Sequence, residues 1–216
     1  MKTRTKALLL VMSALLLVVS TVFATMAFLT SKDEVKNTFT VGKVAITLDE
    51  TDVDIYGEED GTERVKANDY KLLPGHTYIK DPTVHVKANS EESYIRMIVT
   101  ITDYADVLTV FGADFLPQYF VGGWDNAIWV STQEVKVDNN TATYEFRYYK
   151  TVNTLNGNDL DLEPLFTTIT VPGTVKNDAL ALLEEMDINV VAQAIQADGF
   201  GGDANAAWAA FDAQAN

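Results

Sequence analysis

The sequence lacks cysteine entirely, and it has only two histidines and five prolines in 216 residues. Without cysteine there can be no disulfide, thiolate nucleophile, iron–sulfur cluster or zinc site built on thiolates. His76 and His85 lie nine residues apart, and the sequence contains no His-Glu-x-x-His motif, the pattern of a zinc peptidase helix. It contains neither a Gly-x-Ser-x-Gly elbow nor a glycine-rich phosphate loop. We therefore predict no catalytic residue and no organic cofactor, and we do not expect an enzyme.

Basic residues are also scarce: 16 Lys and Arg stand against 31 Asp and Glu, a formal net charge of -15 at pH 7. Such an excess of negative charge argues against electrostatic binding to nucleic acid or to anionic lipid. Hydrophobic residues make up 47% of the chain, which is ordinary for a globular protein and excludes general disorder. The length suits one sizeable domain with a targeting segment.

The N-terminus has the pattern of a secretory signal peptide. Its first six residues include three basic ones, Lys2, Arg4 and Lys6. An apolar run over residues 7–23 follows, and then the small residues Ala24 and Ala27, which suit a signal peptidase pocket that admits only short side chains. The alternative is a membrane anchor, because the apolar segment counted to Leu29 is long enough to span a bilayer. We expect residues 1–27 to be removed, so that only an uncleaved leader would touch a membrane.

Beyond residue 43 the dominant pattern is an alternation of apolar and polar residues with a period of two, which is typical of half-buried β-strands. Strands are predicted over residues 44–48, 83–87, 95–102, 143–149, 167–171 and 188–195, with further short strands between 124 and 137. The expected fold class is mainly β: an antiparallel jelly-roll-like β-sandwich domain, residues 44–216, with a few short helices in the connections.

The connections are predicted from turn and helix signals. Turns are expected at Pro74-Gly75, at Asp138-Asn139-Asn140 and at Pro172-Gly173. Helices are expected within 104–120, from a cap at Asn177 to Met186, and over 204–213, where the alternative is a frayed tail.

One stretch carries too much charge for a core, so residues 49–61 are predicted to form a loop. Its carboxylates make Ca²⁺ the inorganic partner to consider, because a hard cation is bound by several oxygens from one loop. The candidate ligands are Asp49, Asp52, Asp54 and Asp60. Since their spacing does not match the EF-hand loop, a solvated acidic loop is the alternative.

Aromatic residues recur at a period of two in Tyr144, Phe146 and Tyr148, and Trp124 and Trp129 precede them. These side chains could line a ligand groove. Aromatic residues are favoured in strands, however, so a buried stripe is the preferred interpretation.

Three stretches of the sequence carry a resemblance to a known family. The first is residues 24–50, which include Asn37-Thr-Phe-Thr-Val-Gly42 and an alternating strand. The second combines Leu73-Pro-Gly-His-Thr-Tyr-Ile-Lys-Asp-Pro-Thr-Val-His-Val-Lys87 with Ser93-Tyr-Ile-Arg-Met97, and the third is Ala192-Gln-Ala-Ile-Gln-Ala-Asp-Gly-Phe200. Together they resemble the TasA/camelysin family of exported bacterial proteins, which carry a SipW-dependent type of signal peptide. The middle of the chain, about residues 100–185, has no motif that matches.

The resemblance implies a jelly-roll sandwich that is secreted through a SipW-type signal peptidase into the extracellular or biofilm matrix or onto the cell surface. In TasA-like proteins, subunits self-associate into fibres by donor-strand complementation, in which the mature N-terminal segment joins a neighbour's sheet. Residues 28–43 are the candidate donor segment. Its apolar anchors are Phe28, Leu29, Val35 and Phe39. The alternatives are that this segment pairs within its own domain or stays a loose tail.

Two other functions stay open from the sequence. A surface adhesin or ligand-binding sandwich would use the Trp-bearing region 119–130. A camelysin-like metalloendopeptidase is implied by the classification of some relatives, but the number and spacing of the histidines argue against it.

Overall fold

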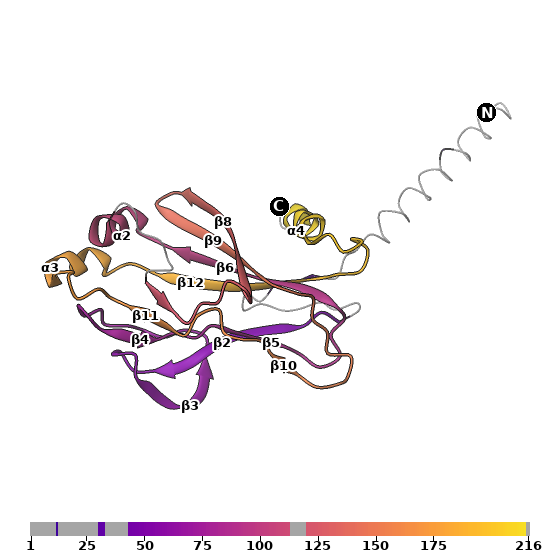
Figure 1. Ribbon diagram of the computed structural model, residues 1–216, viewed down its shortest axis with the longest axis horizontal. Coiled ribbons are helices and arrows are strands. Elements are labelled where there is room, and N and C mark those ends of the chain that lie inside the picture. The colour runs from indigo at the N-terminus through magenta and orange to yellow at the C-terminus, as the bar shows by residue number, and fades with distance from the viewer. Residues whose placement is uncertain (1–11, 13–29, 33–42, 113–119, 215–216) are drawn as a thin grey trace, which may run out of the picture.

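The computed structural model describes residue 12 and residues 30–32, 43–112 and 120–214 of the chain. In this part of the chain, two layers of antiparallel β-sheet face each other across an apolar core (Figure 1). The first layer is one sheet with the strand order β1-β12-β6-β9-β8. Its five strands are β1 (Thr30–Lys32), β12 (Ile188–Gln196), β6 (Ser93–Ile101), β9 (Thr141–Tyr148) and β8 (Trp129–Asp138).

The facing layer consists of two smaller sheets. The first has the order β10-β5-β2-β3, with β10 (Leu160–Asp161), β5 (Thr83–Val86), β2 (Ile46–Val53) and β3 (Glu59–Val65). The second has the order β4-β11-β7, with β4 (Thr77–Ile79), β11 (Thr168–Thr170) and β7 (Val121–Gly122). All pairings between these strands are antiparallel. The prediction of a mainly β, antiparallel fold is confirmed.

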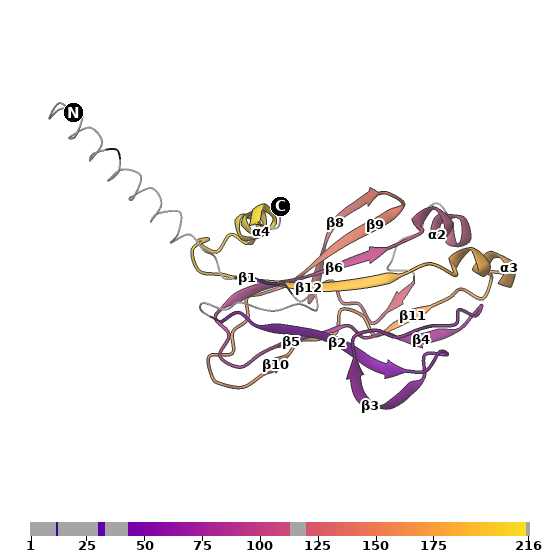
Figure 2. The ribbon, with the colours of Figure 1, turned by 180° about the vertical axis from the view of Figure 1, so that it is seen from behind.

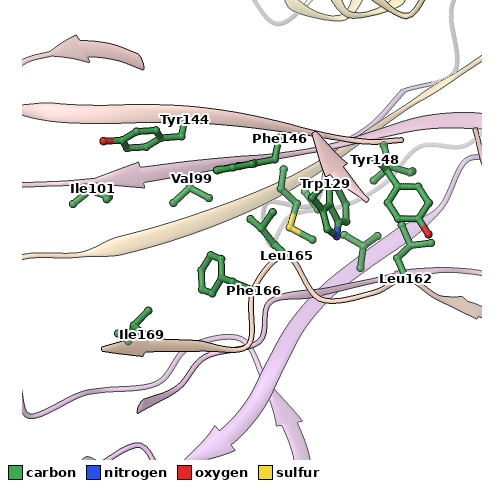
Figure 3. Close-up of a cluster of buried hydrophobic side chains, with 14 of the residues drawn as sticks. Val99, Ile101, Trp129, Tyr144, Phe146, Tyr148, Leu162, Leu165, Phe166 and Ile169 are labelled. Atoms are coloured by element: carbon green, nitrogen blue, oxygen red, sulfur yellow. The ribbon is translucent and has the colours of Figure 1, made fainter. Parts of the chain in front are cut away.

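The core lies where the alternating faces of the two layers meet. Along β9, Tyr144, Phe146 and Tyr148 are buried in turn, whereas the residues between them point outward. Figure 3 shows these rings close to side chains from the connection between β10 and β11, such as Leu165 and Phe166. The aromatic stripe is therefore part of the core, as preferred above. Burial of each such side chain is worth about 1.5–3 kcal/mol, so this alternation decides which face of the sheet turns inward.

Short helices occupy the connections. They are α2 (Tyr104–Phe111), α3 (Asn177–Leu180), a 3-10 turn η2 (Ala181–Leu183) and α4 (Ala204–Gln214). In Figure 1, α2 and α3 lie together at one end of the sandwich, and α4 lies over the outer face of the five-stranded sheet. Within the described ranges, no helix has the length and apolar character that crossing a membrane requires.

The helix α4 is held by an arginine together with a small apolar cluster. Arg96 on β6 is 4% exposed, and its Nε donates to Gln193 Oε1 at 2.8 Å. Its guanidinium contacts Asp212 and lies 4.3 Å and 5.2 Å from the ring centroids of Trp208 and Phe211. The alternative of a frayed tail is therefore wrong, because α4 buries both rings against the sheet.

The predicted loop over 49–61 is the clearest error. The strand β2 continues through Asp49 and Glu50 to Val53, and the chain returns as β3, so this acidic stretch is mostly a hairpin. The strand tolerates these charges because each carboxylate is paired with a cation: Asp49 pairs with Arg64, and Glu50 pairs with Lys80. The density of charged residues alone therefore predicted the wrong secondary structure for this stretch.

Other predicted connections are confirmed or need a correction. The turn at Pro74-Gly75 is present, with φ of 75° at Gly75, and Asn139 and Asn140 form the β8–β9 turn with φ of 48° and 61°. Asn177 is the first helical residue and not the cap, which is Lys176, and no side chain caps this helix. Without a cap, the helix lasts four residues and tightens into η2 rather than continuing to Met186.

The outer strand β8 is one ten-residue strand where several short strands were predicted. Side chains cover part of its free edge. The indole Nε1 of Trp124 donates to the Trp129 carbonyl at 2.8 Å, and the Ser131 N–H donates to Asn126 Oδ1 at 3.1 Å. A register shift between Ser131 and Val135 also bends the strand. The first half of this edge is therefore closed to another strand.

Candidate strand-accepting groove

The edge strand β1 comes from the predicted donor segment. Thr30–Lys32 pairs antiparallel with Ile195, Ala194 and Gln193 of β12, as the view in Figure 2 also shows. The chain therefore places these three residues on a sheet of its own domain. The anchors Phe28, Leu29, Val35 and Phe39, like the cleavage residues Ala24 and Ala27, lie outside the described residues.

The two faces of β12 have different surroundings. Ala192 and Ala194 are fully buried in the core between the layers, and Val190 packs against the same core. Gln193 and Ile195 point the other way, toward Arg96 and the aromatic residues of α4. Even-numbered residues of β12 therefore face inward, and odd-numbered residues face the outer surface.

Beyond the end of β1, β12 borders a groove. Its first part, of about 630 Å³, runs between β12 and β2 and is lined by Asp187–Val191 and Leu48–Glu50. A second part, of about 690 Å³, continues toward α3 and η2. Both parts share the residues Asn68, Asp69, Lys80, Asp187 and Ile188. The groove therefore follows the stretch of β12 that β1 does not pair with.

An ion pair forms the polar part of the groove wall. Lys80 Nζ lies 2.7 Å from Glu50 Oε2, and the two residues are only 7% and 6% exposed. Asn68 supports Glu50 by donating from Nδ2 to Oε1 at 3.1 Å, and the Tyr70 ring lies 5.5 Å from the ammonium. A buried charge without a partner is costly, so each member of this pair depends on the other.

The tyrosine beside this pair stays in its neutral form. Burial, reinforced by the negative charge of Glu50, raises the pKa of Tyr70 well above its ordinary value. Its hydroxyl accordingly donates to the Ile79 carbonyl at 3.1 Å. Tyr70 therefore adds a ring face and no negative charge beside Lys80.

The four Ca²⁺ candidates have separate surroundings. Burial alone would raise the pKa of Asp49, but hydrogen bonds from Arg64 and His85 outweigh it and hold the pKa below its usual value. Asp54 accepts the N–H groups of Tyr56 and Glu58 in a local turn. Asp52 and Asp60 lie on the hairpin. Within the described residues, no three His, Asp or Glu side chains are grouped so as to hold a metal ion.

The two histidines have structural partners. His85 lies between two carboxylates, with Nε2 at 2.8 Å from Asp49 and Nδ1 at 2.6 Å from Asp161. His76 Nε2 lies 2.7 Å from the Tyr56 carbonyl, and its ring meets Tyr78 edge to face at 4.6 Å. Each imidazole therefore joins neighbouring segments of the second layer.

The Trp-bearing region lines a second hollow, an apolar cavity of about 570 Å³ between the layers. Its wall includes Trp124, Phe120 and Phe146, with Asn126 and Ser131 as polar groups. This is the place that a ligand-binding sandwich would use.

Sequence reasoning missed the ion pair in the groove. Glu50 was assigned to an acidic loop, and Lys80 was given no role. The period-two alternation of the strand could have revealed it, because Glu50 follows Ile46 and Leu48 at every second position and therefore points to the same, inward face. A carboxylate on the inward face requires a cation inside the fold, and Lys80 is that cation.

The chain was compared with models of protein families, with curated proteins and with solved structures, and none of them matches it.

Proposed function

We propose that this protein is a secreted structural protein of the extracellular or biofilm matrix, which assembles into fibres when the N-terminal segment of one copy joins the sheet of the next. The observation that carries the proposal is the edge of β12. Its end at Gln193–Ile195 already accepts a strand from the candidate donor segment, and its remaining length borders an open groove. Backbone groups at such an edge form hydrogen bonds with an added strand.

The reach of the chain favours a second copy as the donor. Glu50 lies seven residues after Lys43, which is about 23 Å along a strand that rises about 3.3 Å per residue. The six residues from Asn37 to Lys43 span at most about 20–22 Å when fully extended. A strand that pairs as far as Ile188, which lines the same groove as Glu50, would have to be fully extended to return to Lys43 in the same chain. A neighbouring copy has no such constraint.

Exchange between copies is a head-to-tail contact. The donor segment and the β12 edge are different surfaces, so each copy would use one of each. Contacts of this kind propagate without closing, which gives filaments. In this assembly a neighbour's segment replaces β1 and pairs with more of β12 than the three residues of β1 do.

The proposal is tested by deleting residues 28–36 from the full chain with its leader retained. Secreted protein with the native segment is expected to begin near residue 28 by N-terminal sequencing and to form fibres in electron microscopy. The deleted protein is expected to be a soluble monomer with unchanged β-rich circular dichroism. Fibres of normal width from the deleted protein would show that strand exchange is wrong, and an unfolded product would make the segment part of its own domain.

A second function is supported by the apolar cavity beside Trp124. Cavities of this size with a few polar groups are typical of small-molecule sites, so a ligand-binding or adhesive sandwich is the competing proposal. It predicts that Trp124→Ala abolishes binding of a glycan or apolar probe. It also predicts that removal of residues 28–39 leaves this binding intact. Loss of fibres without any change in binding would assign the two surfaces to separate roles.

A further inference from the structure

Three polar side chains from different segments of the chain meet in the wall of the groove. Glu50 lies on β2, Asn68 follows the end of β3 by three residues, and Lys80 directly follows β4. The two oxygens of the Glu50 carboxylate have different partners: Oε2 accepts from Lys80 Nζ at 2.7 Å, and Oε1 accepts from Asn68 Nδ2 at 3.1 Å. One carboxylate therefore holds an amine nitrogen and a side-chain amide next to each other.

The amide of Asn68 is fixed at both of its ends. Its Oδ1 accepts the Val53 N–H at 3.1 Å, and its Nδ2 also donates to the Thr51 carbonyl at 2.8 Å. A backbone N–H that points at a carbonyl oxygen stabilises the negative charge that develops there when a nucleophile attacks the carbon. The carbonyl carbon of Asn68 is therefore held in place and polarised.

Little water reaches the lysine end of this cluster. Lys80 and Glu50 are only 7% and 6% exposed, and the Tyr70 ring lies 5.5 Å from the ammonium. An amine attacks a carbonyl carbon only in its neutral form, and transfer of a proton from Lys80 Nζ to Glu50 would neutralise both buried groups at once. Asn68 is half-buried and lines both parts of the groove, so a small leaving group has a way out.

We propose that Lys80 and Asn68 become joined by an isopeptide bond within the chain, with Glu50 as the proton relay. The bond between Lys80 Nζ and Asn68 Cγ forms, the Cγ–Nδ2 bond breaks, and ammonia leaves. Nζ gives up two protons: one passes through Glu50 to Nδ2 and completes the ammonia, and the other stays on Glu50, which ends as a neutral carboxylic acid. The ion pair in the structure is the state before the bond forms.

Such a bond would supply a covalent link to a chain that has no cysteine for a disulfide. It would close the segment from residue 68 to residue 80, which contains the Pro74-Gly75 turn and β4. A link of this kind restricts the unfolded chain as a disulfide does. The inference is independent of the proposed strand exchange, because all three groups belong to one chain.

The first test is the intact mass of the purified protein, compared with the mass calculated from the N-terminus found by sequencing. The measured mass is expected to be about 17 Da too low, which is the mass of one ammonia. Trypsin is then expected to give a branched product, residues 67–71 joined through Asn68 to residues 72–87, because acylated Lys80 is no longer a cleavage site. The full calculated mass would overturn the proposal. So would a deficit of about 18 Da with the branch at Glu50, which is the loss of water from a carboxylate.

Variants assign the roles of the reacting groups. Lys80→Arg keeps a cation beside Glu50 but removes the nucleophile, so we expect the full mass with unchanged β-rich circular dichroism. The matched control is Lys71→Arg, the same change at an exposed lysine of the same segment, which is expected to keep the deficit. Proton relay contributes about 10²- to 10⁴-fold to a rate, so freshly purified Glu50→Gln is expected to have the full mass. A deficit that persists in Lys80→Arg would show that another group reacts, and one that persists in Glu50→Gln would refute the relay.

Discussion

Two buried cations, Arg96 in the first layer and Lys80 in the second, differ in how completely they are surrounded. Arg96 has an amide, two carboxylates (Asp212 and Glu145) and two aromatic rings around its guanidinium. Among the residues that the structure describes, Lys80 has one carboxylate and one ring beside its ammonium. Arg96 lies under α4, whereas Lys80 lies in the wall of a groove. Arg96 has an acceptor at each of its three nitrogens and fastens one element to another, whereas the described residues offer the three N–H donors of Lys80 one carboxylate.

The largest effect is expected from Lys80→Met. This change leaves the Glu50 carboxylate buried without a cation, and breaking a buried pair in this way costs about 3–5 kcal/mol of unfolding free energy. Urea unfolding measures the loss. Adding Glu50→Gln removes the stranded charge and is expected to restore most of the stability. A loss below about 1 kcal/mol for Lys80→Met alone would contradict the buried pair.

A smaller loss is expected from Arg96→Met, about 2–3 kcal/mol, because its partner Asp212 is exposed to water and its other partner, Glu145, keeps a second cation in Arg147. The helix α4 should loosen, since Trp208 and Phe211 lose the guanidinium between them. Hydrogen exchange is expected to rise in Ala204–Gln214 more than in β9. Uniform exchange across both elements would show that Arg96 supports the whole sheet rather than the helix.

The smallest effect concerns Asp49, a carboxylate that is hydrogen-bonded to Arg64 and His85. Its folded pKa lies below its ordinary value of about 3.9, so its contribution to stability is present above about pH 4 and is lost as the pH falls through the folded pKa. In Asp49→Asn, the decrease of melting temperature between about pH 4 and 2 should be shallower. Asp60→Asn, on the exposed part of the hairpin, is the control. Parallel curves for Asp49→Asn and the unchanged protein would mean that Arg64 and His85 do not favour the ionised form.

The elements that the sequence predicted well are those whose pattern is local. The strand β6 alternates without interruption, and the Asn139-Asn140 turn supplies residues that accept positive φ. The local pattern predicted the wrong secondary structure where that structure depends on residues far away in the sequence. Asp49 and Glu50 belong to a strand because Arg64 and Lys80 neutralise them, and those partners follow 15 and 30 residues later.

The candidate site could be predicted only in part. The family resemblance, with the apolar anchors in agreement, made residues 28–43 a donor candidate, but the surface that receives a strand depends on which edge of which sheet lies open. That edge is set by the order β1-β12-β6-β9-β8, in which β12 pairs with a strand almost a hundred residues away. Similarly, Trp208 and Phe211 are three residues apart and share one face of α4, yet nothing in the local sequence identified Arg96 as the residue beneath them.

The side-chain caps on β8 have a consequence for the shape of any assembly. With Trp124 and Asn126 occupying that edge, the five-stranded sheet can extend at the β12 side and not at the start of β8. Two copies therefore cannot associate symmetrically through the start of β8. Every copy in a filament would point the same way, so its two ends would be chemically different: one would present an unfilled groove and the other an unused N-terminal segment. Such a filament has a direction, and growth and loss of subunits would proceed at different rates at its two ends.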